Sequence, residues 1–267
     1  MSFSLSGKTA IVTGAANGIG LAIGRQFAKE GANVMFVDQD EAALLQELGD
    51  DMEDSNIRHF AGDLRERLTI ANLLSATIDA FDQVDILVNG ARKVVASEPL
   101  NPDDESVEFL LKHNLMSTLR LSQLVAKRMI RQGEEREGEG VNGAIINLSS
   151  IAARRTHPDL MGYSVASAAL DQMTRSLAVS LAPHRIRVNS IAFGSVMSAS
   201  MQATLKDNRA MRQDIEKHTP LNRIAAPAEL TETAQFLASD ASAFMTGQVL
   251  TLDGGRTLLD PVTAPVH

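Results

Sequence analysis

Short apolar runs rich in β-branched residues alternate along this chain with longer stretches in which apolar residues recur at helical spacing. The first run, Lys8 to Thr13, is followed by a glycine-rich segment and then by Leu21, Ile23, Phe27 and Ala28, which fall on one face of a helix. This order of positions predicts a strand, a tight turn and a helix.

Similar units extend the pattern over the whole length of 267 residues. Strands are expected at 33–37, 57–61, 84–88, 144–148, 185–191 and 248–252, and helices at 41–52, 65–81, 103–131, 160–181 and 227–238. Charged, glycine-rich residues 133–142 predict a solvated loop, and residues 195–221 are expected to be helical in short pieces. Seven strands alternating with helices predict an α/β protein: one Rossmann-type, doubly wound domain over 1–267, with a seven-stranded parallel sheet and helices on both faces.

Composition and charge narrow the range of functions. The chain is 44% hydrophobic and 22% charged, and its formal net charge of −8 argues against nucleic acid or an anionic membrane as a partner. No apolar run reaches the length of a membrane span and the first residues lack a secretory-signal pattern, so we expect a cytoplasmic protein. The absence of cysteine excludes thiolate chemistry, and the six histidines lack metal-ligand spacing, so no metal site is expected.

A glycine loop joins the first strand to the first helix. Glycines allow the backbone to approach a pyrophosphate closely, and the N-terminus of the following helix offers free N–H groups and a positive dipole end. The spacing is G-x-x-x-G-x-G, and with a strand before it and a helix after it we predict a dinucleotide site rather than a turn without a ligand. The loop residues expected to bind the cofactor are Gly14, Asn17, Gly18, Ile19 and Gly20.

Asp38 ends the second predicted strand, about twenty residues beyond the glycine loop. A carboxylate at this place accepts hydrogen bonds from the adenosine ribose and repels the 2′-phosphate of NADP, so NAD is the expected cofactor. The alternative is that Asp38 only caps the next helix. Asn89, Ser150 and Gly194 also follow strand ends, and the carboxyl ends of parallel strands form one crevice, so we expect all four residues to face it.

Tyr163 is the only tyrosine in a chain with nine phenylalanines, which favours a function for its hydroxyl. It follows Ser150 by thirteen residues and, on the predicted helix, lies one turn before Ser167. A serine on a loop and a tyrosine on a helix could both point at one carbonyl or carbinol oxygen.

With these residues the chain resembles the short-chain dehydrogenase/reductase family over nearly its whole length. TGAANGIG is similar to the cofactor loop of that family, Asp63 and Leu64 to its adenine-contacting pair, Asn114 to its helix asparagine, and Ser150 and Tyr163 to its catalytic serine and tyrosine. The segment PLNRIAAPAELTETAQFLASDASAFMTGQVLTLDGG resembles its C-terminal pattern.

The resemblance implies hydride transfer between a nicotinamide and an alcohol or carbonyl carbon, with Ser150 holding the substrate oxygen and Tyr163 exchanging the proton. It implies a homotetramer or homodimer built on the helices at 103–131 and 160–181, a substrate lid at about 195–221, and a C-terminal tail, 256–267, that packs on a neighbouring subunit. Further cofactor contacts are expected from Asp63, Leu64, Asn89, Gly90, Ala91, Gly194 and Val196.

Three departures from the family pattern all flank the nicotinamide end of the predicted site. The lysine four residues after the tyrosine is Ser167. The family's Asn-Asn-Ala-Gly is Asn89-Gly90-Ala91-Arg92, and its Pro-Gly is Phe193-Gly194. A free tyrosine titrates near ~10 and needs a nearby cation to act as a base at neutral pH, so the loss of the lysine matters.

Two hypotheses follow. In the first the protein is an active NAD-dependent dehydrogenase with a relocated cation, supplied by Arg92, Lys93, Arg154 or Arg155. Arg92 and Lys93 could instead lie on a solvated loop, and Arg154 and Arg155 could bind a substrate carboxylate or phosphate. Arg92, Arg154, Arg155 and Phe193 are therefore also candidate substrate contacts. In the second the protein is a catalytically impaired NAD-binding protein, a sensor or an assembly partner.

Overall fold

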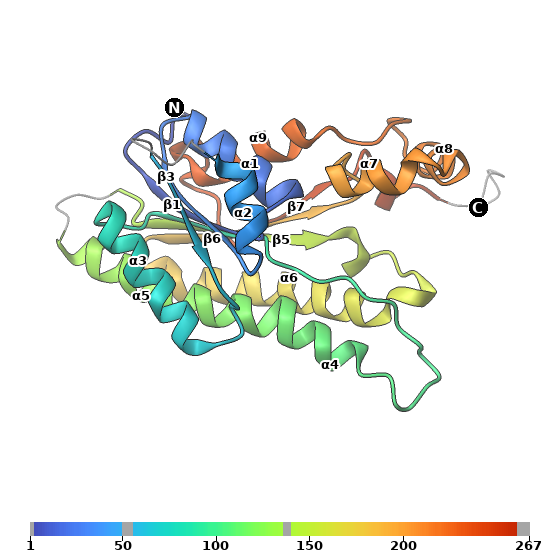
Figure 1. The fold of residues 1–267 in the computed structure, drawn as a ribbon, viewed down its shortest axis with the longest axis horizontal. Helices are drawn as coiled ribbons and strands as arrows, with labels where there is room; N and C mark the ends of the chain where they lie inside the picture. Colours follow the sequence, from blue (N-terminus) through green and yellow to red (C-terminus); the bar gives the residue numbers. More distant parts are fainter. Residues whose placement is uncertain (1–2, 50–55, 136–139, 261–267) are drawn as a thin grey trace.

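The computed structural model describes residues 3–49, 56–135 and 140–260 (Figure 1). Its strands form one sheet in the order β3-β2-β1-β4-β5-β6-β7, and every neighbouring pair is parallel. The strands are β1 (Thr9–Thr13), β2 (Asn33–Asp38), β3 (Ile57–Ala61), β4 (Ile86–Asn89), β5 (Gly143–Ser150), β6 (Ile186–Phe193) and β7 (Val249–Leu252). The predicted seven-stranded parallel sheet is confirmed, and the strand order reverses between β1 and β4, where ligands of such sheets bind.

Helices cover both faces of the sheet (Figure 1). One layer contains α1 (Gly18–Lys29), α2 (Glu41–Leu48) and α9 (Pro227–Ala238), and the other contains α3 (Arg67–Phe81), α5 (Ser117–Glu135) and α6 (Met161–Leu181). Short 3-10 turns lie at Ile151–Ala153 (η3), Pro158–Leu160 (η4), Ala182–His184 (η5), Asp240–Ser242 (η6) and Arg256–Leu258 (η7). Because each face is covered, β1 is buried along its whole length, as in other doubly wound sheets.

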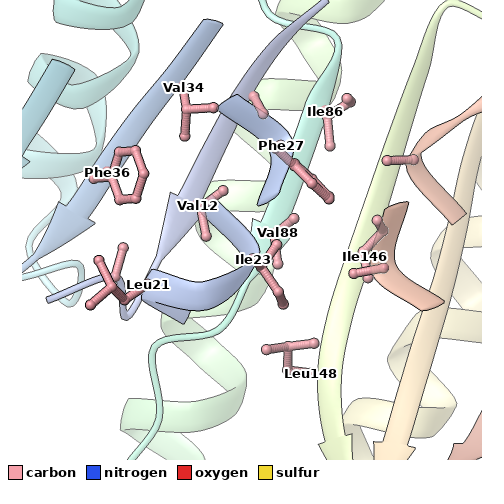
Figure 2. Packing of buried hydrophobic residues seen from close by; sticks show 14 of the residues in the cluster. Val12, Leu21, Ile23, Phe27, Val34, Phe36, Ile86, Val88, Ile146 and Leu148 are labelled. Atoms are coloured by element: carbon pink, nitrogen blue, oxygen red, sulfur yellow. The ribbon is translucent and has the colours of Figure 1, made fainter. Parts of the chain in front are cut away.

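One core fills the space between the sheet and α1, α2 and α9. Figure 2 shows Val12, Val34 and Phe36 from the strands packing towards Leu21 and Phe27 of α1. Gly24 permits the close approach of α1, because a Cβ there would lie 2.3 Å from the Phe36 ring. A second core on the opposite face joins the other side of the sheet to α3, α5 and α6.

The long helix predicted at 103–131 is divided in the structure. It consists of α4 (Ser106–Leu110), a π-helical turn (η2, Leu111–Met116) that contains Asn114, and α5. The apolar spacing does not reveal the extra residue of a π turn, because periodic positions resume after it. The helix also runs on to Glu135, so Gly133 is buried rather than in a solvated loop, and 136–139 lie outside the described residues.

The segment predicted to be helical in short pieces forms α7 (Ala199–Lys206) and α8 (Arg209–Lys217) beyond the carboxyl end of β6 (Figure 1). Leu205, Ile215 and Ile224 form a small separate core there, with Met197 and Met201 packed against it. Of the expected C-terminal tail, 261–267 lie outside the described residues, as do 50–52 of the helix expected at 41–52. In the described ranges no helix is long and apolar enough to cross a bilayer.

Candidate active site

The loop between β1 and α1 has the geometry that its glycines require. Gly14 and Gly18 adopt left-handed backbone conformations, with φ of +68° and +57°. A Cβ on Gly20 would lie 2.1 Å from the carbonyl oxygen of Gly14, so a side chain there would displace the loop. The backbone therefore forms an open cradle at the N-terminus of α1, which suits a pyrophosphate.

This cradle is one end of a cleft of about 480 Å³, within the size range of small-molecule sites. The cleft follows the carboxyl ends of β1, β2 and β4. Most of the predicted cofactor residues line it, namely Gly14, Asn17, Gly18, Ile19, Gly20, Asp38, Asp63, Leu64, Gly90 and Ala91. The residues present thus fit a dinucleotide in size, backbone access and hydrogen-bonding groups.

Asp38 lies in the cleft wall and also fixes the cradle. Its carboxylate accepts hydrogen bonds from the backbone N–H groups of Ala16, at 3.1 Å, and Asp40, at 3.2 Å. The cap of α2 is Asp40, whose side chain accepts from the N–H of Ala43 at 3.0 Å. Asp38 therefore is not the helix cap of the alternative interpretation.

Asp63 and its neighbour Leu64 line the same cleft next to Arg65, a residue that the sequence analysis did not single out. The guanidinium of Arg65 donates two hydrogen bonds from Nε to the Asp63 carboxylate, at 2.9 and 2.8 Å, and Nη2 contacts it as well. These bonds lower the pKa of Asp63 against the opposing effect of burial. Arg65 is thus a cation in the cleft that is already paired with a carboxylate.

Tyr163 is buried near the start of α6, packed with Leu110 and Ala166. It borders a second, small cavity of about 10 Å³, room for roughly one water. Ser167, Asn114 and Asn89 line this cavity too. The structure therefore brings together three of the four predicted catalytic residues.

Ser150, the fourth, ends β5 and begins the 3-10 turn η3. Its Oγ accepts a hydrogen bond from the N–H of Ala152 at 3.1 Å, which leaves the hydroxyl proton available for another acceptor. Ser150 is also the register partner of Phe193 in the neighbouring strand β6.

Asn114 is presented by the π-helical turn. Its side-chain amide donates to the carbonyl of Lys93 and accepts from the N–H of Lys93, both at 2.8 Å.

Thr13, which sequence reasoning missed, binds the backbone of the same loop two residues earlier. Its Oγ1 accepts from the N–H groups of Gly90, at 3.0 Å, and Ala91, at 3.1 Å. The only signal in the sequence was the place of Thr13 just before the glycine loop.

The Asn89 side chain points into a buried network rather than into the large cleft. Its Nδ2 donates to the Oγ of Ser122 at 3.0 Å and to Oδ1 of Asn147 at 2.9 Å, and Asn147 in turn donates to Thr174 at 2.8 Å. These bonds connect β4 and β5 to α5 and α6. Asn89 thus fixes the relative position of the elements that carry the cleft and Tyr163.

The two predicted contacts after β6 lie beside the cleft rather than in its wall. Gly194 donates its N–H to the carbonyl of Leu252 at 3.0 Å, and Val196 is buried. Ser198, from the same loop, is the residue that lines the cleft. Sequence reasoning missed Ser198.

The candidate cations separate in space. Arg92 lines both the large cleft and the Tyr163 cavity, and its guanidinium carbon lies 4.4 Å from the centre of the Phe193 ring. Lys93 lines the large cleft. Arg154 and Arg155 line neither of these two cavities. Arg154 donates to Thr251 of β7 at 2.5 Å, and Arg155 donates to the carbonyl of Thr257.

Two observations limit the chemistry of the site. Within the described part of the chain, no group of three or more histidine, aspartate or glutamate side chains could hold a metal ion. The polar groups around the small cavity are instead the phenol of Tyr163, the hydroxyls of Thr118 and Ser167, two asparagine amides and the guanidinium of Arg92. A doubly wound sheet with a glycine cradle and a buried tyrosine near it fits a dinucleotide-binding oxidoreductase.

Comparison with known proteins gives the family. The family model described as enoyl-(acyl carrier protein) reductase matches residues 14–257. Oxidoreductase UcpA of Salmonella typhimurium is 32% identical over 270 aligned positions, which cover 98% of this chain and 99% of that protein. The 3-oxoacyl-(acyl-carrier-protein) reductase FabG of Chlamydia trachomatis is 30% identical, over 96% of this chain and 99% of that protein.

The solved structures agree with the sequences. The structure of 7α-hydroxysteroid dehydrogenase complexed with NADH and 7-oxo glycochenodeoxycholic acid matches with a TM-score of 0.85 at 30% identity, covering 95% of each chain. The chain belongs to the short-chain dehydrogenase/reductase family and is an oxidoreductase of that type, a family that binds a nicotinamide cofactor.

Proposed function

We propose that this protein is an NAD-dependent dehydrogenase or reductase that transfers a hydride between the nicotinamide and an alcohol or carbonyl carbon. One observation carries the proposal: Tyr163, the only tyrosine, borders a cavity that shares Ala91, Arg92 and Leu148 with the dinucleotide cleft. A substrate oxygen beside Tyr163 would therefore lie next to the inner end of a dinucleotide bound in the cleft.

Each group of residues would have a separate role in binding or catalysis. The cradle formed by Gly14, Gly18 and Gly20 would hold the pyrophosphate, and Asp38 the adenosine ribose, with preference for NAD because a carboxylate repels a 2′-phosphate. NAD, when bound, supplies the hydride acceptor or donor. Ser150 would donate its free hydroxyl proton to the substrate oxygen, and Tyr163 would take the proton of an alcohol or give one to a nascent alkoxide.

The chemistry is tested with the purified protein, an alcohol and ketone panel and both dinucleotides. We expect NADH to bind more tightly than NADPH, with turnover of at least one substrate. Tyr163→Phe should lower kcat by about 1000-fold, since general acid–base catalysis contributes ~10²–10⁴-fold. Ser150→Ala should lower kcat as well, whereas Ser149→Ala, a buried neighbour in the same strand, is the matched control. Full turnover by Tyr163→Phe would refute the assignment.

A second function rests on one specific observation, the uncharged Ser167 at the position of the family lysine. A protein that binds NAD without turning over substrate would be a sensor or an assembly partner. It would bind NADH with measurable affinity, show no turnover with any member of the panel, and change its oligomeric state with the ligand. Robust turnover would eliminate this function.

We also propose that the protein is a homotetramer or homodimer. Apolar side chains are exposed on α6 and on the α4–η2 segment that precedes α5: Phe109 is 38% exposed, Met116 36%, Val165 42% and Val179 77%. Burial of such surface against a second copy would stabilise the assembly. Light scattering at several protein concentrations tests this, and a stable monomer would contradict it.

A further inference from the structure

The proposed reaction requires a positive charge near Tyr163, and the helix that carries the tyrosine does not supply it. Ser167, one turn further along α6, is buried and uncharged. A phenol is a poor base at neutral pH unless a cation stabilises its ionised form. The charge has to come from another element.

The structure selects one of the four candidate cations. Arg154 and Arg155 are bound at β7 and in the turn after it, and Lys93 lines the outer cleft. Arg92 lines the Tyr163 cavity. Of the described residues around that cavity, Tyr163 and Arg92 are the two that carry ionisable side chains. Arg92 is therefore the charged side chain that borders the same cavity as Tyr163.

Arg92 is held in place on both sides of its backbone. The preceding residue, Ala91, donates its N–H to Thr13 at 3.1 Å, and the following residue, Lys93, is bound through both backbone groups by Asn114. The guanidinium lies over the face of Phe193 at 4.4 Å, within the range of an attractive cation–π contact. Arg92 is thus fixed by its neighbours and by its own side chain.

Phe193 in turn is fixed by the sheet. It is 5% exposed and pairs in register with Ser150 on one side and Leu252 on the other. The Phe193 ring, over which the Arg92 guanidinium lies, therefore belongs to β6. The neighbouring strand, β5, ends at Ser150, the serine that is proposed to bind the substrate oxygen. The Arg92–Phe193 pair connects the cleft to both proposed catalytic groups.

We infer that Arg92, stacked on Phe193, supplies the positive charge at Tyr163 that a lysine at position 167 supplies elsewhere in the family. The inference rests on the proposed function. Arg92, in place of the family's glycine, and Phe193, in place of its proline, together compensate for the loss of the lysine at Ser167.

The role is electrostatic. Arginine does not release its proton near neutral pH, so Arg92 stabilises the ionised phenol without exchanging protons and is a positioning residue. It is exposed to the cleft, and a dinucleotide there would exclude water and strengthen its field at Tyr163.

The chain offers an unusually direct test. It has one tyrosine and no tryptophan, so the absorbance of tyrosinate in a pH titration reports on Tyr163 alone. We expect Arg92→Gln to lower the ionisation constant of the phenol by about tenfold, the effect of one nearby unit charge. Arg92→Lys should retain part of the effect. Lys93→Gln, which removes the same charge one residue away, should leave the titration unchanged.

Turnover gives an independent readout. In Arg92→Gln the rise of kcat with pH should move to higher pH, and kcat at neutral pH should fall about tenfold. Phe193→Leu should reproduce part of this loss by releasing the guanidinium. Adding Ser167→Lys to Arg92→Gln should restore the wild-type titration and profile.

The outcomes are distinct. An Arg92→Gln protein that is folded by circular dichroism and titrates like the wild type overturns the inference, and so does a Lys93→Gln protein with the same shift as Arg92→Gln. If the titration shifts as expected but no substrate is turned over by the wild type, the charge assignment stands and the proposed function fails.

Discussion

Asn114 binds the backbone of Lys93 at both its N–H and its carbonyl, with two hydrogen bonds of 2.8 Å each. The π-helical turn Leu111–Met116 makes this possible, because it turns Asn114 towards the loop after β4. The asparagine is therefore a clamp on the loop that carries Arg92. We therefore expect Asn114 to affect the chemistry through the position of that loop.

Replacing Asn114 with alanine should loosen the loop. Two backbone groups of Lys93 would lose partners, and at about 1 kcal/mol per hydrogen bond the free energy of unfolding should fall by ~1–3 kcal/mol. We expect kcat/KM to fall at least tenfold as well, because Arg92 is no longer held. Urea unfolding and steady-state kinetics measure the two effects.

A matched control for Asn114→Ala is Thr77→Val, which removes one buried hydrogen bond, from Oγ1 to the carbonyl of Leu73 at 2.8 Å, in α3 away from the site. It should lower stability without lowering kcat/KM. An Asn114→Ala protein with wild-type kinetics would mean that the clamp is not needed for catalysis.

Asp38→Asn should weaken the preference for NAD. The single amide oxygen can still accept the hydrogen bond from Ala16, which keeps the contact with the cradle. The bond from the N–H of Asp40 to the other oxygen is lost, and so is the charge that repels a 2′-phosphate. We expect the ratio of kcat/KM for NAD to that for NADP to fall by about 10- to 100-fold, or ~1.4–3 kcal/mol. Asp40→Asn removes the same charge from the same cleft wall and keeps a good helix cap. An equal change in both variants would assign the preference to the general field of the cleft rather than to Asp38.

Gly20→Ala should weaken dinucleotide binding. The added methyl group would meet the Gly14 carbonyl at 2.1 Å, and relief of that overlap must deform the cradle. We expect the affinity for NADH, followed by its fluorescence, to fall at least tenfold, or ~1.4 kcal/mol. Gly140→Ala, where a Cβ meets nothing within 4 Å, should bind like the wild type. Unchanged binding by Gly20→Ala would place the pyrophosphate elsewhere.

The sequence predicts best the features that depend on neighbouring residues. The glycine cradle and the acidic residue at the end of β2 are local patterns, and the alternation of strands and helices fixes the sheet. The π turn at Asn114 was not predictable, because apolar spacing resumes after one inserted residue. The contact between Arg92 and Phe193 was not predictable either, since it joins the ends of two strands separated by β5 in the sheet. The direction of Arg154 was not predictable for the same reason, because it depends on Thr251 of β7, almost a hundred residues further along the chain.

Acid stability should depend on Glu229 at the start of α9. Hydrogen bonds from Arg223, at 2.6 Å to each carboxylate oxygen, and then from the N–H of Ala226, at 2.8 Å, lower the pKa of Glu229 from 4.5 to about 2. Because its pKa is lower in the folded state than in the unfolded chain, the carboxylate stabilises the fold fully above pH 4.5, and this stabilisation is lost as the pH falls towards 2. The pair is half exposed, so solvent screening reduces the contribution to about 1 kcal/mol.

Glu229→Gln should therefore lower the free energy of unfolding by about 1 kcal/mol at pH 7, and the difference from the wild type should shrink to nearly zero by pH 2. Chemical unfolding between pH 2 and 7 measures this. Glu232→Gln removes the same charge from an exposed position on the same helix and should show a smaller difference. A Glu229→Gln difference that stayed constant down to pH 2 would contradict the assignment, because a loss that does not titrate with the carboxylate has another cause.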